Sequence, residues 1–101
     1  MLAAMRPEYG GRVELKLVTG SESLARYDVR MFDPRAEWTT QADVSGERAL
    51  TLAGWTGPDQ PPGWLETLAK TLLRGTVRQQ QAAGSWPRRV TRWRPGPGGE
   101  E

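Results

Sequence analysis

The sequence contains neither cysteine nor histidine. Without cysteine, it can form no disulfide and no thiolate zinc site. Without histidine, it lacks the commonest general base and the commonest metal ligand, and it cannot assemble a Ser–His or Cys–His nucleophile pair. We therefore expect a protein that is not an enzyme and that uses no metal and no cofactor.

Long apolar runs are missing as well. No stretch of the 101 residues approaches the roughly 18 apolar residues that a membrane span requires. Residues 1–11 contain no apolar core long enough for a secretory signal. The expected location is therefore cytoplasmic, with no membrane as partner.

Acidic residues are scarce in the second part of the chain, so the net positive charge lies there. Residues 1–59 carry seven basic and nine acidic residues, a net charge of −2, whereas residues 60–101 carry seven basic and three acidic residues, a net charge of +4. Only two of the 14 basic residues are lysine. A strong preference for arginine often reflects coding bias, so it gives only weak support to nucleic-acid binding.

The stretch from residue 61 to residue 84 has the pattern of an amphipathic α-helix. Its apolar stripe, at spacings of three and four, consists of Leu65, Leu68, Ala69, Leu72, Leu73, Thr76 and Val77. Pro61 and Pro62 suit a first helical turn, and Gly84 suits the residue just past the end. Gly75 is a poor helix former and marks either a close backbone contact or a soft spot. We expect a helix over about residues 61–83.

Four segments before this helix alternate apolar and polar residues, which is the pattern of half-buried strands. They span residues 12–18, 24–32, 36–44 and 47–55, and short turns separate them. Consecutive strands of this kind predict an antiparallel meander with one apolar face, which the helix then covers.

The predicted fold class is therefore α+β, with a four-stranded antiparallel meander, a single C-terminal helix over one face, and a basic Trp/Arg segment after the helix. We expect one domain over residues 12–94, between a flexible leader at 1–11 and a disordered tail at 95–101. Trp38 and Trp64 are predicted to be core residues.

The opposite face of the sheet is predicted to be charged. Its expected residues are Glu14, Lys16, Arg26, Asp28, Arg30, Glu37, Gln41 and Asp43. Single-strand binders built on sheets display aromatic side chains on this face, whereas here only Phe32 is aromatic. This composition argues against a nucleic-acid site on the sheet.

Arginine and tryptophan are interleaved after the helix, from Trp86 to Arg94. Residues 85–94 fit either a short helix, with Trp86, Val90 and Trp93 at helical spacing, or a fifth strand. Guanidinium and indole groups suit a nucleic-acid backbone, an acidic protein groove or an anionic membrane surface. In the competing interpretation, the apolar residues pack on the domain while the arginines face water.

We expect a small binding protein that acts through protein–protein contacts and associates with itself, because a sheet has two open edges and one helix leaves apolar rim uncovered. The alternative is a nucleic-acid-binding protein that uses the basic helix face together with the arginines of residues 88–94. The candidate partner-binding residues are Lys70, Arg74, Arg78, Trp86, Arg88, Arg89, Arg92, Trp93 and Arg94. No residue is predicted to be catalytic or to bind a cofactor or metal.

Overall fold

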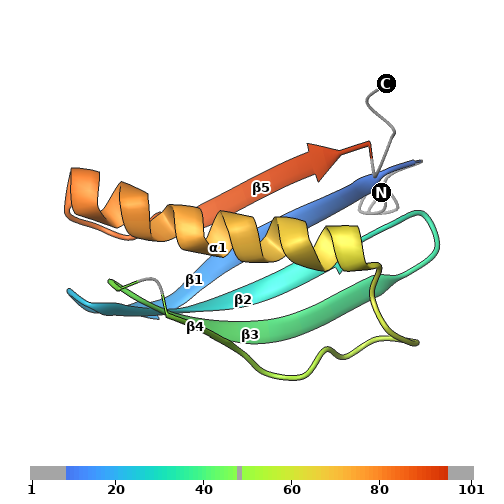
Figure 1. Ribbon diagram of the computed structural model, residues 1–101, viewed down its shortest axis with the longest axis horizontal. Coiled ribbons are helices and arrows are strands. Elements are labelled where there is room, and N and C mark those ends of the chain that lie inside the picture. The colour runs from blue at the N-terminus through green and yellow to red at the C-terminus, as the bar shows by residue number, and fades with distance from the viewer. Residues whose placement is uncertain (1–8, 48, 96–101) are drawn as a thin grey trace.

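The computed structural model describes residues 9–47 and 49–95, and it has one helix packed on one face of a five-stranded antiparallel sheet (Figure 1). The elements are β1 (Gly11–Gly20), β2 (Leu24–Phe32), β3 (Glu37–Ser45), β4 (Leu50–Leu52), α1 (Gly63–Ala83) and β5 (Arg89–Arg94). The order across the sheet is β4-β3-β2-β1-β5. The predicted α+β class is confirmed, and the meander gains a fifth strand on the side of β1.

Local sequence explains the hairpins of the meander. At the β2–β3 turn, the carboxylate of Asp33 accepts hydrogen bonds from the main-chain N–H groups of Arg35 (2.8 Å) and Ala36 (2.9 Å). An aspartate that satisfies N–H groups two and three residues ahead stabilises a tight reversal, and the proline at position 34 cannot continue a strand. The reversal places β3 beside β2 over its full length.

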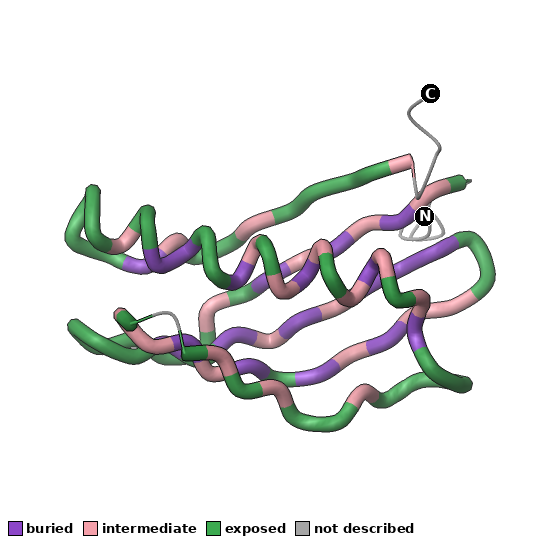
Figure 2. The backbone as a smooth tube through the Cα atoms, in the orientation of Figure 1, coloured by how far each residue is buried: buried purple, intermediate pink, exposed green. Residues whose placement is uncertain are grey.

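The core lies between α1 and the sheet. Buried residues alternate with more exposed ones along β1, β2 and β3, and they also line the side of α1 that faces the sheet (Figure 2). The buried helix residues are Leu65, Ala69, Leu73, Thr76 and Val77, all from the predicted stripe. Trp38 is buried as predicted.

The predicted stripe is wider than the surface that α1 buries. Leu68 and Leu72 are only half-buried, and so is Trp64, which was predicted to be a core residue. These three residues are spaced four apart, so they form one flank of the helix. A single helix on a sheet buries its central line and leaves such a flank partly in water.

The helix begins two residues later than predicted. Pro61 and Pro62 precede it, and the carbonyl oxygen of Pro62 accepts hydrogen bonds from the N–H groups of Leu65 and Glu66, both at 3.1 Å. At the other end, Gly84 adopts the left-handed conformation, with φ at 83°, and its N–H bonds to the carbonyl of Gln80 at 2.8 Å. Gly84 therefore ends the helix as predicted.

The fourth strand is much shorter than the predicted segment 47–55. Only Leu50–Leu52 form β4, because the regular pairing with β3 is interrupted between Ala53 and Thr56. The hydroxyl of Thr40 lies 2.8 Å from the carbonyl oxygen of Ala53, and Thr56 then exchanges both main-chain hydrogen bonds with Thr39. The prediction of a nine-residue strand was therefore wrong at both of its ends.

Gly11, which was predicted to belong to the leader, is the first residue of β1. Residues 1–8 and residues 96–101 lie outside the described part of the chain, as do the predictions of a flexible leader and a disordered tail for them.

Candidate functional site

The connection between α1 and β5 is held against the domain by hydrogen bonds at Trp86 and Pro87. The indole N–H of Trp86 donates a hydrogen bond to the carbonyl of Ser21 at 2.6 Å, and the hydroxyl of Tyr27 donates one to the carbonyl of Pro87 at 2.7 Å. The Trp86 ring packs so closely on Gly20 that a Cβ there would lie 2.9 Å from it. With 7% of its surface exposed, Trp86 is an anchor of the fold and not an accessible contact residue.

Of the two alternatives predicted for residues 85–94, the structure shows the fifth strand, β5, and not a helix. Residues 89–94 pair antiparallel with β1, so that Val90 lies opposite Leu15 and Trp93 opposite Arg12. In a strand, residues an odd number apart point to opposite faces. Val90 therefore points to the helix side and Trp93 to the outer side, and the helical spacing of these two residues has no structural meaning.

Trp93 is 40% exposed and leans on Tyr9. Its indole N–H donates to the Tyr9 carbonyl at 3.0 Å, and the two rings meet edge to face with centroids 5.2 Å apart. This contact holds one face of the indole against the domain while part of the ring remains accessible.

β5 is the outermost strand, so one of its edges is open. The N–H of Leu17 bonds to the carbonyl of Arg88, and the register continues from there in antiparallel pairs. In an antiparallel ladder, every second residue bonds to the neighbouring strand and the residues between face the other way. Arg89, Thr91 and Trp93 therefore direct their N–H and C=O groups away from the sheet.

Two arginines of β5 cover this open edge. The guanidinium of Arg92 donates a hydrogen bond to the carbonyl of Thr91 at 2.9 Å, and that of Arg94 donates one to the carbonyl of Trp93 at 3.0 Å. Both arginines are exposed. Side-chain donors thus occupy two of the acceptors that a neighbouring strand would use.

The positive charge beside this edge is not neutralised. Arg88, Arg89, Arg92 and Arg94 are all exposed, and within the described ranges no carboxylate lies at ion-pair distance from their guanidinium groups. Exposed cations that are not paired with a carboxylate attract acidic groups and raise the rate at which an acidic partner associates.

The structure does not place all candidate residues on one surface. The register puts Arg89 on the outer face beside Lys16, whereas Arg92 and Arg94 lie on the helix side. Arg88 borders a shallow hollow together with Glu22. The interleaved arginines therefore divide between two faces and an end of the strand.

The basic residues of α1 form a separate group. The ammonium of Lys70 lies 3.8 Å from the carboxylate of Glu66, which also accepts a hydrogen bond from the indole N–H of Trp55 at 3.1 Å. Lys70 thus lies on the flank of α1 that faces the chain after β4, away from β5. Arg74 and Arg78 are exposed. The proposed combination of this helix face with the β5 arginines is not assembled into one continuous surface.

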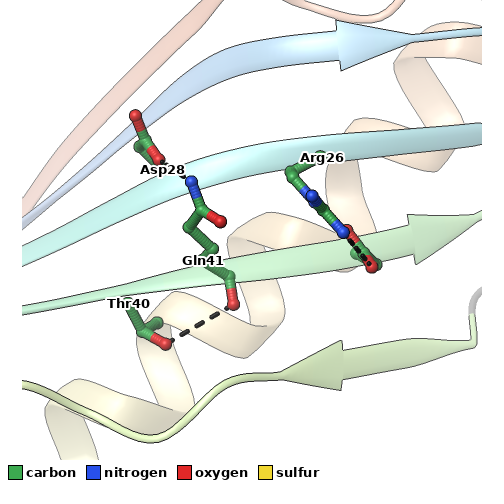
Figure 3. A network of polar contacts seen from close by, with 5 residues as sticks. Arg26, Asp28, Thr40 and Gln41 are labelled. Carbon is green, nitrogen blue, oxygen red and sulfur yellow. Dashed lines mark hydrogen bonds and ion pairs between the residues drawn. The ribbon is translucent and has the colours of Figure 1, made fainter.

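Polar side chains of the outer face of the sheet pair across neighbouring strands (Figure 3). Arg26 donates two hydrogen bonds to Asp43, at 2.8 and 3.2 Å, and these bonds lower the pKa of the Asp43 carboxyl. Gln41 donates to Asp28 at 2.8 Å. Such exposed pairs contribute little to stability, and they neutralise most of the charge in the middle of this face.

Phe32 does not act as an aromatic platform on this face. It is fully buried, because the guanidinium groups of Arg12 and Arg30 lie over its ring at 5.0 and 5.1 Å from the centroid. Arg30 also lines a shallow hollow of about 470 Å³, together with polar residues such as Thr39 and Gln41. Neither feature offers bases a surface on which to stack.

The sequence predicted two open sheet edges, but it did not identify residues 89–94 as one of them. The signal was present, since Arg89, Thr91 and Trp93 alternate with Val90 and two arginines, as strand residues do.

Among residues 9–47 and 49–95, no helix is long and apolar enough to cross a membrane, and no group of three metal-ligating side chains is present.

No protein-family model matches the chain, and no curated protein and no solved structure shows detectable similarity to it.

Proposed function

We propose that this protein is a non-enzymatic interaction protein that binds a partner protein along the open edge of β5. The observation that carries the proposal is the row of outward-facing main-chain groups at Arg89, Thr91 and Trp93, which pair with no other strand of the described chain. An unpaired edge is a template for an added strand, and main-chain hydrogen bonds then supply affinity. The opposite edge, β4, is only three residues long and is a poorer template.

The distribution of charge favours a protein over a nucleic acid. Proteins that bind single strands follow the phosphate backbone with a continuous positive groove and stack bases on exposed aromatic rings. Here the β5 arginines divide between two faces, the outer sheet face is charge-paired, and Phe32 is buried. Nucleic acid is the competing partner. Binding that falls steeply with salt and that requires Arg74 and Arg78 would establish it instead.

Self-association belongs to the same proposal, by way of the apolar flank of α1 formed by Trp64, Leu68 and Leu72. Pairing of two β5 strands is disfavoured, because residues 88–94 carry four arginines and no acid, and the two copies would bring like charges together. A two-fold contact through the flank would instead cover the half-buried apolar side chains. Light scattering at micromolar concentration tests this part, with Leu68→Lys expected to restore the monomer mass.

The substitution Thr91→Pro tests the β5 edge. The Thr91 N–H points away from β1, so a proline there removes no hydrogen bond of the sheet, and edge strands tolerate proline at such positions. Its ring blocks the place where a partner strand would bond. Thr91→Val is the matched control, because it keeps the N–H and the branched shape.

In affinity capture from the native source, the wild type and Thr91→Val are expected to retain the same partner, and Thr91→Pro is expected to lose it. Circular dichroism and melting curves establish that all three are folded. A partner retained equally by all three proteins would show that the contact lies elsewhere.

A further inference from the structure

We infer that the strand accepted by β5 is an acidic, extended segment of the partner, and that Arg92 and Arg94 exclude other strands from this edge. The inference rests on the proposed function and specifies its partner. It starts from the two hydrogen bonds in which Arg92 and Arg94 cover the carbonyl groups of the residues before them.

Any strand that adds to β5 must compete with these two guanidinium groups for the outward-facing carbonyls. The carbonyls of Thr91 and Trp93 are the acceptors that an incoming strand needs, and both already receive a side-chain donor. A neutral strand replaces each of these bonds with a main-chain bond and leaves the guanidinium without its acceptor. The gain in binding free energy is small, because the β5 carbonyl only exchanges one donor, the guanidinium group, for another, the N–H of the incoming strand.

An acidic strand changes this balance. Its carboxylates offer each displaced guanidinium group an ion pair that can be bidentate, in which both partners are charged, in place of a single bond to a neutral carbonyl. The main-chain ladder and the ion pairs then form together. A basic strand, including β5 of a second copy, is repelled instead.

The positions of the acidic residues follow from the register. Directly opposite residues of paired strands share a face, so partner carboxylates are needed opposite Arg89 on the outer face and opposite Arg92 and Arg94 on the helix side. Apolar partner residues fit opposite Val90, which is half-buried, and opposite the partly exposed ring of Trp93. From its N-terminal to its C-terminal end, an antiparallel partner strand then has the pattern acidic, apolar, acidic, polar, apolar, acidic.

A synthetic peptide containing EVETVE meets this pattern and is the probe. Its matched controls are QVQTVQ, which removes the charge, KVKTVK, which reverses it, and EVEPVE, which keeps the charge but cannot donate the hydrogen bond expected at Thr91. Titration of each into the isotope-labelled protein, followed by NMR, gives the affinities. We expect EVETVE to bind about tenfold or more tightly than QVQTVQ and EVEPVE, and KVKTVK not to bind.

Amide hydrogen exchange gives a second readout at single residues. Bound EVETVE is expected to slow exchange at Arg89, Thr91 and Trp93, whose N–H groups face outward, and to leave Val90 and Arg92 unchanged, because β1 already holds them. Equal affinity for EVETVE and EVEPVE would mean that charge alone attracts the peptide, and it would overturn the inference.

Two variants separate this inference from the proposed function. Arg92→Gln with Arg94→Gln is expected to abolish the preference for EVETVE over QVQTVQ, whereas Thr91→Pro is expected to abolish binding of both. If EVETVE binds no better than QVQTVQ while Thr91→Pro still loses the captured partner, the acidic segment is excluded and the β5 edge stands. If Thr91→Pro retains both the captured partner and the EVETVE peptide, both proposals fall. Displacement of EVETVE by an oligonucleotide that itself binds more tightly would assign the edge to nucleic acid and overturn the inference.

Discussion

The hydroxyl of Tyr27 donates a hydrogen bond to the carbonyl of Pro87 at 2.7 Å, across sixty residues of sequence. Tyr27 lies on the buried face of β2, and Pro87 belongs to the short connection that leads into β5. The bond therefore links the core directly to the start of the open edge. Together with Trp86, it fixes where β5 begins.

Replacing Tyr27 by phenylalanine is expected to lower the free energy of unfolding by about 1–2 kcal/mol, because the Pro87 carbonyl loses its donor in a partly buried site. Urea denaturation measures the loss, and trypsin is expected to cut faster after Arg88 and Arg89 as the connection loosens. Tyr9→Phe is the control, since Tyr9 is 63% exposed, and it is expected to leave stability nearly unchanged. Equal denaturation midpoints for Tyr27→Phe and wild type would contradict this role.

The same tyrosine predicts a pH dependence. Burial raises the pKa of Tyr27 to about 12, from its ordinary value of 10.0. The unfolded chain thus releases the phenolic proton at a lower pH than the folded protein does, so base favours unfolding between about pH 10 and pH 12. The stability advantage of wild type over Tyr27→Phe is expected to be constant below pH 10 and to shrink above it. An advantage that stays constant up to pH 11.5 in chemical denaturation would disprove the shift.

Gly75 offers a stabilising substitution. It lies in the exposed part of α1, and a Cβ there would meet no atom within 4 Å, so it is a soft spot and not a close contact. Gly75→Ala is expected to raise the free energy of unfolding by roughly 0.5–1 kcal/mol, through better helix propensity and a more restricted unfolded chain. Gly84→Ala is the matched control, and its left-handed conformation predicts a loss of about 1 kcal/mol instead. Thermal melts with the same sign for both would contradict these assignments.

The burial of the helix leucines predicts which truncation costs more stability. Leu73→Ala is expected to destabilise the protein by about 2–5 kcal/mol, as truncation of a fully buried leucine does. Leu68→Ala removes the same atoms from a half-buried flank, so we expect less than half of that loss. Denaturant titrations of the two variants check the order. If Leu68→Ala destabilised the protein as much as Leu73→Ala, the flank would be as buried as the core.

Much of the fold could be predicted because the chain repeats simple local patterns. The second strand was predicted over residues 24–32 and occupies those residues, since apolar and polar side chains alternate there without interruption. The end of α1 followed from Gly84, whose conformation few other residues adopt. These features depend on neighbouring residues only, which a sequence displays directly.

The features that were missed depend on distant residues. Residues 89–94 combine branched side chains with helical spacing, and only their pairing with Gly11–Lys16 decides in favour of a strand. From the sequence, Phe32 was expected on the outer face at the end of a strand. In the structure, the guanidinium groups of Arg12 and Arg30 cover its ring from neighbouring positions of the sheet. The length of the fourth strand likewise depends on Thr56, which takes over the pairing with Thr39.

The candidate site was predicted in composition but not in geometry. The sequence shows that arginines gather after the helix, but it does not show that Arg89 lies on one face and Arg92 on the other. It also cannot show that Arg92 and Arg94 turn back onto main-chain carbonyls. Which side of an extended segment is open depends on the strand that pairs with it, and β1 lies about seventy residues or more earlier in the sequence.

The pairing of β1 with β5 has a consequence for the growing chain on the ribosome. β1 is made first and finds β2 at once, but its other edge waits until residues 89–94 have emerged. During that interval the second edge of β1, with Val13 and Leu15 in its middle, remains unpaired, and such edges recruit other chains. A chain shortened to end at Gly84 is therefore expected to collect in the pellet on centrifugation, whereas the full chain stays in the supernatant.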